Sequence, residues 1–172
     1  MLQPAESSWI EPLVLAFYRP AIQLATLLVR DYTLAQDIVQ EAFVRVWLSP
    51  RTPREMSAFR PWLYKTVVNL ARDHQRHQGR WARLRFGRAA SDNPMDVAER
   101  HEADAALGDA VRGLSRREQE AVYVRFFEDA PFEEVGRIIG VRSGTARVLV
   151  HRALAKLRQQ LTLPTEHEGP DA

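Results

Sequence analysis

The chain contains no cysteine among its 172 residues, so it can form neither a disulfide nor a thiolate metal site. No apolar run approaches the ~20 residues that a membrane-spanning helix needs. The N-terminal residues 1–12 also lack the positive-then-apolar order of a signal peptide. The five histidines form no convincing ligand set, because His74 and His77 lie among arginines that would repel a cation. We therefore expect no metal, no cofactor and a reducing compartment.

Alternating strand patterns are absent as well, whereas apolar residues recur at helical spacing along most of the chain. Expected helices cover residues 12–30, 34–47, 59–76 and about 98–112. Residues 86–97 are small, polar and interrupted by glycine and proline, which indicates a linker. The sequence predicts an all-α protein.

Local signals place the ends of these helices. Pro20 predicts a kink or restart in the first helix, and Pro61 suits the first turn of the third. Two pairs have the spacing of a capping box, Thr33 with Gln36 and Ser115 with Glu118. Within the third helix, the spacing of Trp62 from its apolar neighbours favours a place in the core.

Residues 131–158 predict two short amphipathic helices joined by a tight turn. Gly140 is a natural helix breaker between them, and Ser143 could cap the second helix through its hydroxyl. The apolar face of the second helix leaves a basic face pointing outward. A basic helix presented by a partner helix is how helix-turn-helix proteins read a DNA major groove. An ordinary helical hairpin with a solvated arginine face is the alternative at this point.

Charge is distributed unevenly, although the net charge is only +2. Residues 12–88 carry 13 Lys/Arg against 5 Asp/Glu, and residues 114–161 carry 9 against 6. Between them, residues 89–113 carry 2 against 6. Basic segments gain counterion-release free energy on a phosphate backbone, which an acidic connector would avoid. The pattern favours two DNA-facing modules.

Three segments resemble, in the right order, the motifs of extracytoplasmic-function (ECF) sigma factors, the minimal bacterial sigma subunits. Residues 34–47 read LAQDIVQEAFVRVW and resemble the family pattern AxDxxQExFxxxW. Residues 59–76 read FRPWLYKTVVNLARDHQR and resemble FxxWLxxxxxNxxxDxxR. Residues 114–158 resemble the family's C-terminal DNA-reading domain. Together the matches span about residues 12–160.

The resemblance implies two small helical domains on a flexible linker. Region 2 would cover residues 12–85, the linker with an acidic helix 86–113, and region 4 residues 114–161. Such a protein is cytoplasmic and is not an enzyme. It binds core RNA polymerase and directs it to promoter DNA, with region 2 melting the minus-ten element and region 4 reading the minus-thirty-five element. An inhibitory anti-sigma factor is the expected protein regulator.

The resemblance also implies the residues of each interface. The 34–47 helix would dock on a coiled coil of the largest polymerase subunit through Asp37, Gln40, Glu41 and Arg45, unless these simply solvate its outer face. An opened promoter needs aromatic and amide groups for an extruded base and cations for phosphates. In region 2 these would be Tyr64, Lys65, Asn69, Arg72, Arg76 and Arg80. In region 4 the DNA-binding residues would be Arg142, Ser143, Thr145, Arg147, His151 and Arg152.

Region 4 departs from the family pattern in its second helix. The family commonly reads GTVKSRLHRA where this chain has GTARVLVHRA, so Val148 and Leu149 replace a serine and an arginine. A lost groove contact of this kind is worth about 1–3 kcal/mol, although helical spacing favours a packed Leu149. Pro131 stands where a capping serine is usual, and Gly136 where alanine is usual. Two alternatives therefore stay open: a plain DNA-binding regulator, and a sigma-like interaction protein with weak promoter reading.

Overall fold

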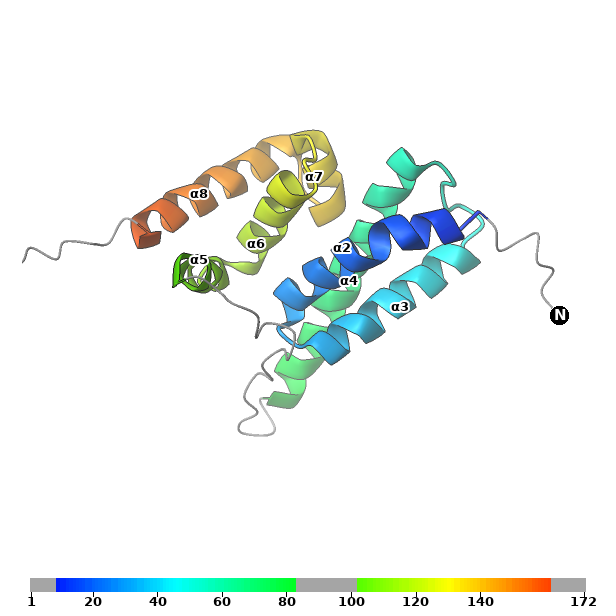
Figure 1. Cartoon of the computed structure of the whole chain (residues 1–172), viewed down its shortest axis with the longest axis horizontal. Helices are drawn as coiled ribbons and strands as arrows, with labels where there is room; N and C mark the ends of the chain where they lie inside the picture. Colours follow the sequence, from blue (N-terminus) through cyan, green and yellow to red (C-terminus); the bar gives the residue numbers. More distant parts are fainter. Residues whose placement is uncertain (1–8, 83–101, 162–172) are drawn as a thin grey trace, which may run out of the picture.

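The computed structural model describes residues 9–82 and 102–161, and within these ranges every regular element is a helix (Figure 1). The all-α fold expected from the sequence is confirmed. The first group consists of α2 (Glu11–Val29), α3 (Tyr32–Leu48) and α4 (Met56–Ala82). The second consists of α5 (Glu102–Arg112), α6 (Arg116–Val122), the π-helical turn η2 (Tyr123–Phe127), α7 (Phe132–Ile139) and α8 (Ser143–Leu161).

Two helix starts in the first group differ from the sequence prediction. Helix α3 is capped by Asp31, whose carboxylate accepts a hydrogen bond of 3.0 Å from the backbone N–H of Leu34. The prediction of a capping box that starts at Thr33 was therefore wrong, because Asp31 reaches the free N–H groups first. Helix α4 begins at Met56, so Pro61 lies inside it rather than in its first turn. Pro20 also lies inside a continuous helix, α2.

Aromatic rings form the centre of the first group. Phe59 of α4 lies 5.9 Å from Phe17 of α2 and 6.4 Å from Phe43 of α3, measured between ring centroids. Aliphatic residues of the three helices fill the space around these rings. One residue from each helix thus meets at the same point, which fixes the relative positions of α2, α3 and α4.

Helix α2 has the length and mean hydropathy of a possible membrane span. The expectation that no segment approaches this limit was therefore wrong. Its most apolar positions, among them Leu13, Phe17 and Leu24, are buried against α3 and α4. The core helix of a globular protein has the same composition, and this packing is the observation that favours that interpretation.

The predicted helix-turn-helix is present in the second group. Gly140 ends α7 in the left-handed conformation, with φ at 75°, and its backbone N–H donates to the carbonyl of Gly136 at 2.9 Å. Helix α8 then begins at Ser143 itself. Gly136 allows a close approach, because a Cβ at this position would lie 2.7 Å from the carbonyl oxygen of Val141.

A capping box starts α6, as predicted. The backbone N–H of Ser115 donates to the Glu118 carboxylate at 2.9 Å, and Lys156 of α8 donates to the same carboxylate at 2.8 Å. Burial alone would raise the pKa of Glu118, but the hydrogen bonds from Lys156 and Ser115 outweigh it and hold that pKa below its usual value. Helix α5, expected as part of the linker, places Ala110 in a small apolar cluster with α6 and α8.

The two helix groups share one continuous apolar core. Tyr123, Val135 and Ile138 of the second group belong to the same buried cluster as the aromatic residues of the first. Helix α7 packs against α4, and α6 packs against α2. The chain therefore buries its two sequence modules against each other.

Candidate promoter and polymerase interfaces

Helix α4 carries a row of polar residues along one side. Lys65, Asn69, Arg72 and Arg76 are spaced by four, three and four residues, which places them on the same side of a helix. Lys65, Asn69 and Arg76 are exposed, whereas Arg72 is largely covered by the second helix group. Arg80 continues the row in sequence, but its side chain lies outside the described residues.

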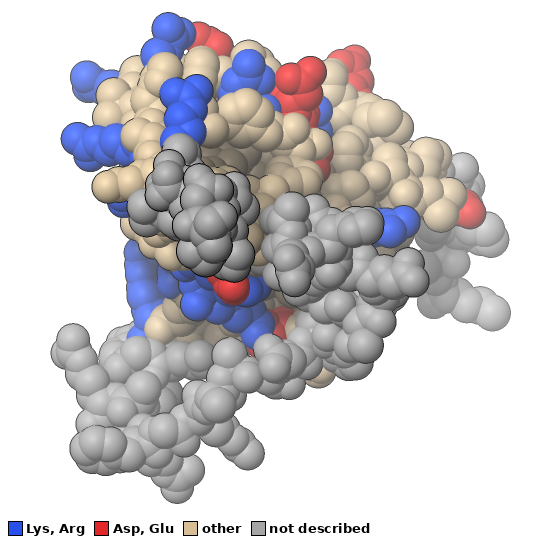
Figure 2. Space-filling model, turned by 60° about the vertical axis from the view of Figure 1, so that its left-hand side comes forward, with Lys and Arg blue, Asp and Glu red and all other residues tan. Residues whose placement is uncertain are grey.

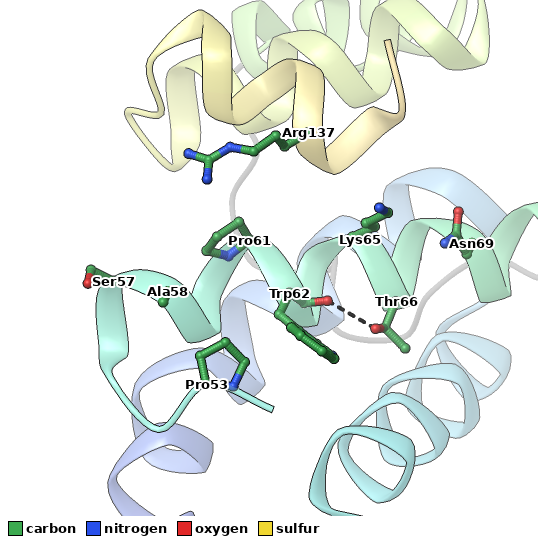
Figure 3. A pocket seen from close by; sticks show the side chains of 9 residues that line it. All are labelled: Pro53, Ser57, Ala58, Pro61, Trp62, Lys65, Thr66, Asn69 and Arg137. Carbon is green, nitrogen blue, oxygen red and sulfur yellow. Dashed lines mark hydrogen bonds between the residues drawn. The ribbon is translucent and has the colours of Figure 1, made fainter. Parts of the chain in front are cut away.

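A groove of about 610 Å³ lies between this part of α4 and α7 (Figure 3). Lys65 and Asn69 stand on the side of α4 that faces α7, and Arg137 extends from α7 towards Pro61. The full lining consists of Pro53, Ser57, Ala58, Pro61, Trp62, Lys65, Thr66, Asn69 and Arg137. The groove thus combines an apolar and aromatic wall with an amide and two cations. This is the chemistry that an unstacked base and its phosphates need.

Tyr64 and Trp62 of α4 differ in burial from what the sequence predicted. Tyr64, expected to line the base pocket, is fully buried, with its ring 6.3 Å from Phe17 in an edge-on contact. Burial raises the pKa of its hydroxyl, and the Glu128 carboxylate raises it further. Trp62, expected in the core, is only partly buried and forms part of the groove wall. In this conformation Tyr64 cannot stack on a base, so its assignment to the pocket was wrong.

Helix α3 exposes the polar face that the sequence predicted. Asp37, Gln40, Glu41 and Arg45 are all exposed, and Arg45 forms an ion pair of 2.5 Å with Glu41 one turn before it. Sequence reasoning missed the apolar part of this surface. Its exposed fractions are 50% for Val44, 37% for Trp47 and 72% for Leu48. Trp47 lies one residue before α3 ends at Leu48, and its ring is partly open to solvent.

The second helix of the helix-turn-helix keeps a basic outer face. Arg142, Thr145, Arg147, His151 and Arg152 are exposed, and Ser143, the first residue of the helix, is partly buried. The guanidinium of Arg147 lies 4.9 Å from the ring centroid of Phe132, a contact that holds it at the start of α8. In Figure 2, Lys and Arg side chains gather along one edge of the upper half of the molecule.

The altered positions of α8 separate into one packed and one exposed residue. Leu149 is partly buried against the main core, as helical spacing predicted. Val148 is 47% exposed. Leu149 is therefore a packing residue, and arginine at this position would not simply restore a DNA contact.

Comparison with known proteins decides between the interpretations. Residues 13–80 match the family model of sigma-70 region 2, and residues 110–159 match that of sigma-70 region 4. The chain is 33% identical to the RNA polymerase sigma factor SigV of Bacillus subtilis, over 85% of this chain and 84% of that protein. It is 35% identical to the RNA polymerase sigma factor CarQ of Myxococcus xanthus, over 78% of each. The chain belongs to the sigma-70 family.

Its place within the family is the ECF group. The ECF RNA polymerase sigma factor SigE of Mycolicibacterium smegmatis is 31% identical over 92% of this chain and 63% of that protein. A solved sigma factor, RpoE of Bartonella quintana in complex with the anti-sigma factor NepR, has the same fold, with a TM-score of 0.74 at 20% identity. The similarity covers 89% of this chain and 96% of that one. The first helix group is thus region 2 of this sigma factor, and the second contains region 4.

Proposed function

We propose that this chain binds core RNA polymerase and directs promoter-specific initiation of transcription as an ECF sigma factor. Region 2, residues 12–85, melts the minus-ten element, and region 4, residues 114–161, reads the minus-thirty-five element. The acidic segment 86–113 connects them. The observation that carries the proposal is the coincidence of both family matches with the exposed polar faces of α3, α4 and α8. The alternative of a plain duplex-DNA regulator leaves the α3 and α4 faces without a role.

The groove beside α4 is the proposed site of an extruded non-template base. Trp62 offers a ring to stack on, Asn69 an amide for the base edge, and Lys65 a cation for the neighbouring phosphate. Base–aromatic stacking contributes about 1–3 kcal/mol per base, which is comparable to the cost of unstacking one step. Arg72 and Arg76 continue the phosphate path along the same side of α4.

The exposed face of α3 is the proposed docking surface for core polymerase. It combines Asp37, Gln40 and Glu41 with the exposed side chains of Trp47 and Leu48. Exposed apolar residues beside polar ones are typical of protein interfaces, in which aromatic residues carry much of the binding free energy. The apolar surface thus adds affinity to the polar contacts that the sequence predicted.

The chemistry of the chain is that of a binding protein rather than an enzyme. Its relatives are sigma factors, and the proposed sites are exposed faces and a groove suited to nucleic acid and protein. We expect it to act in the cytoplasm, where promoter DNA and polymerase are found. An anti-sigma factor is its expected regulator, as in the solved RpoE complex.

The test is promoter melting by an Asn69→Ala variant, on a promoter identified with the wild-type chain. If Asn69 holds an extruded base, permanganate reactivity of the minus-ten thymines should fall by about tenfold, since a lost base contact costs ~1–3 kcal/mol. Closed-complex affinity should change by less than about twofold. Gln159→Ala, which removes an exposed amide from the far end of α8, should melt the promoter normally. Equal loss of melting and closed binding in Asn69→Ala would contradict the role.

A further inference from the structure

Val148 lies at the centre of the outward face of α8. The buried side of this helix consists of Ala146, Val150, Ala153 and Leu157. At about 100° per residue, Val148 lies almost directly opposite that side, and its side chain is 47% exposed. Helices α5, α6 and α7 pack against α8 (Figure 1). The face that bears Val148 is therefore the one that α8 turns towards a ligand.

The neighbours of Val148 on this face are suited to DNA. Thr145 lies one turn before it and is exposed. His151 and Arg152 lie one turn after it and are exposed as well. Gly144, also one turn before it, has open space where a Cβ would lie, with nothing within 4 Å. Val148 is thus the one apolar side chain among polar and cationic groups on a helix face that is free to enter a major groove.

The isolation of Val148 favours a nucleic-acid contact over a protein contact. A protein docks on a contiguous patch of several exposed apolar side chains. The exposed large apolar residues of α8 are Val148 and Leu161, and Leu161 is the last residue of the helix. A single apolar side chain surrounded by cations and hydroxyls matches a DNA groove, in which phosphates flank the base edges.

A valine side chain can recognise one feature of a base-pair edge. It has neither a hydrogen-bond donor nor an acceptor, so the polar pattern of the edge gives it no partner. The apolar group that the major groove presents is the C5 methyl group of thymine. A β-branched side chain in a helix also keeps one strongly preferred χ1 rotamer, so the methyl groups of Val148 are fixed before DNA binds.

We propose that Val148 is a specificity-determining residue of region 4, which selects a thymine in the minus-thirty-five element by contact with the C5 methyl group of that base. The proposal rests on the proposed function, because it requires α8 to lie in the major groove of a promoter. Serine, the residue common at this position in the family, can hydrogen-bond to several bases. Valine therefore replaces a permissive contact with one that favours thymine.

The test removes the thymine methyl group without changing base pairing. Deoxyuridine replaces each thymine of the minus-thirty-five element, one at a time and in either strand, in a duplex promoter identified with the wild-type chain. The protein is the full chain bound to core polymerase. Filter binding at low temperature, at which the promoter stays closed, measures affinity without a contribution from melting. One replacement should weaken the wild-type complex by about three- to fourfold, the loss expected for one buried methyl group.

Variants at position 148 assign that loss to Val148. Val148→Ala and Val148→Ser should bind the thymine and deoxyuridine duplexes with affinities within about 1.5-fold of each other, because the coupling to the methyl group is lost. Val148→Thr keeps the branched shape and one methyl group, so it should retain part of the preference. Circular dichroism should be unchanged in all three variants, since the position is exposed.

Arg147→Ala is the matched control. It removes a cation from the neighbouring position and should weaken binding to every duplex, while the effect of the methyl group stays as in wild type. Loss of the methyl effect in this variant too would overturn the proposal, because weak binding in general would then explain the result.

Three further outcomes contradict the thymine contact. Equal affinity of the wild-type complex for every thymine and deoxyuridine duplex would overturn it, as would a methyl effect that persists in Val148→Ala. If Val148→Ala keeps the methyl effect and binds core polymerase more weakly, Val148 makes a protein contact instead. A complex that binds no promoter specifically would contradict the proposed function and this proposal together. Specific binding without a methyl effect contradicts the thymine contact alone.

Discussion

Gly136 fixes how closely α7 approaches the turn of the helix-turn-helix. Helix propensity alone gives glycine in a helix a cost of ~1 kcal/mol relative to alanine. The structure shows the compensation: a Cβ at Gly136 would lie 2.7 Å from the Val141 carbonyl oxygen and 3.2 Å from the Ser143 nitrogen. Glycine in place of the usual alanine lowers the helix propensity of α7, but it permits a tight turn before α8.

This predicts opposite effects for two glycine-to-alanine substitutions. Gly136→Ala would push the backbone of α7 away from the turn at Val141 and Ser143, and should destabilise the chain by about 1–3 kcal/mol. Gly144→Ala lies in α8 with nothing within 4 Å of the new Cβ, and should stabilise it by roughly 0.5–1 kcal/mol. Thermal unfolding followed by circular dichroism measures both changes. A midpoint for Gly136→Ala at or above that of wild type would contradict the close approach.

At the scale of elements, hydrophobic periodicity predicted the described helices well because each buries one side. Periodicity could not show which of Tyr64 and Trp62 is buried, since the surroundings of Tyr64 include Glu128 and Tyr123, which are distant in sequence. It also could not show that Trp47 is exposed, because that depends on where α3 ends. The exposed polar residues of α3, by contrast, followed directly from their position opposite the stripe.

The docking surface on α3 yields a prediction for polymerase binding. Asp37→Ala combined with Gln40→Ala should weaken core binding by about tenfold, because two interface contacts are lost. Trp47→Ala should weaken it at least as much, while Gln159→Ala serves as the exposed control. Pull-down titration with core polymerase measures these affinities, and unchanged circular dichroism shows that the fold is retained. Affinities within twofold of wild type for both changes would exclude this face of α3 as the docking surface.

At the scale of the whole molecule, charge patterning separated two basic modules but gave no sign that they pack together. The contact depends on pairs distant in sequence, Arg72 with Glu120 and Arg60 with Glu134, which no local pattern reveals. Sequence motifs identified the family because they lie within single helices. The groove between α4 and α7 could not be predicted, since Arg137 of region 4 completes a lining that region 2 otherwise supplies.

The central claim is that this chain gives core RNA polymerase its promoter choice. Run-off transcription on fragmented DNA from the source bacterium, with core polymerase alone and with the chain added, tests it most directly. The account predicts discrete transcripts that start at a shared promoter sequence, require the chain and are lost with Asn69→Ala. Transcripts that are the same with and without the chain, although it binds polymerase, would contradict it.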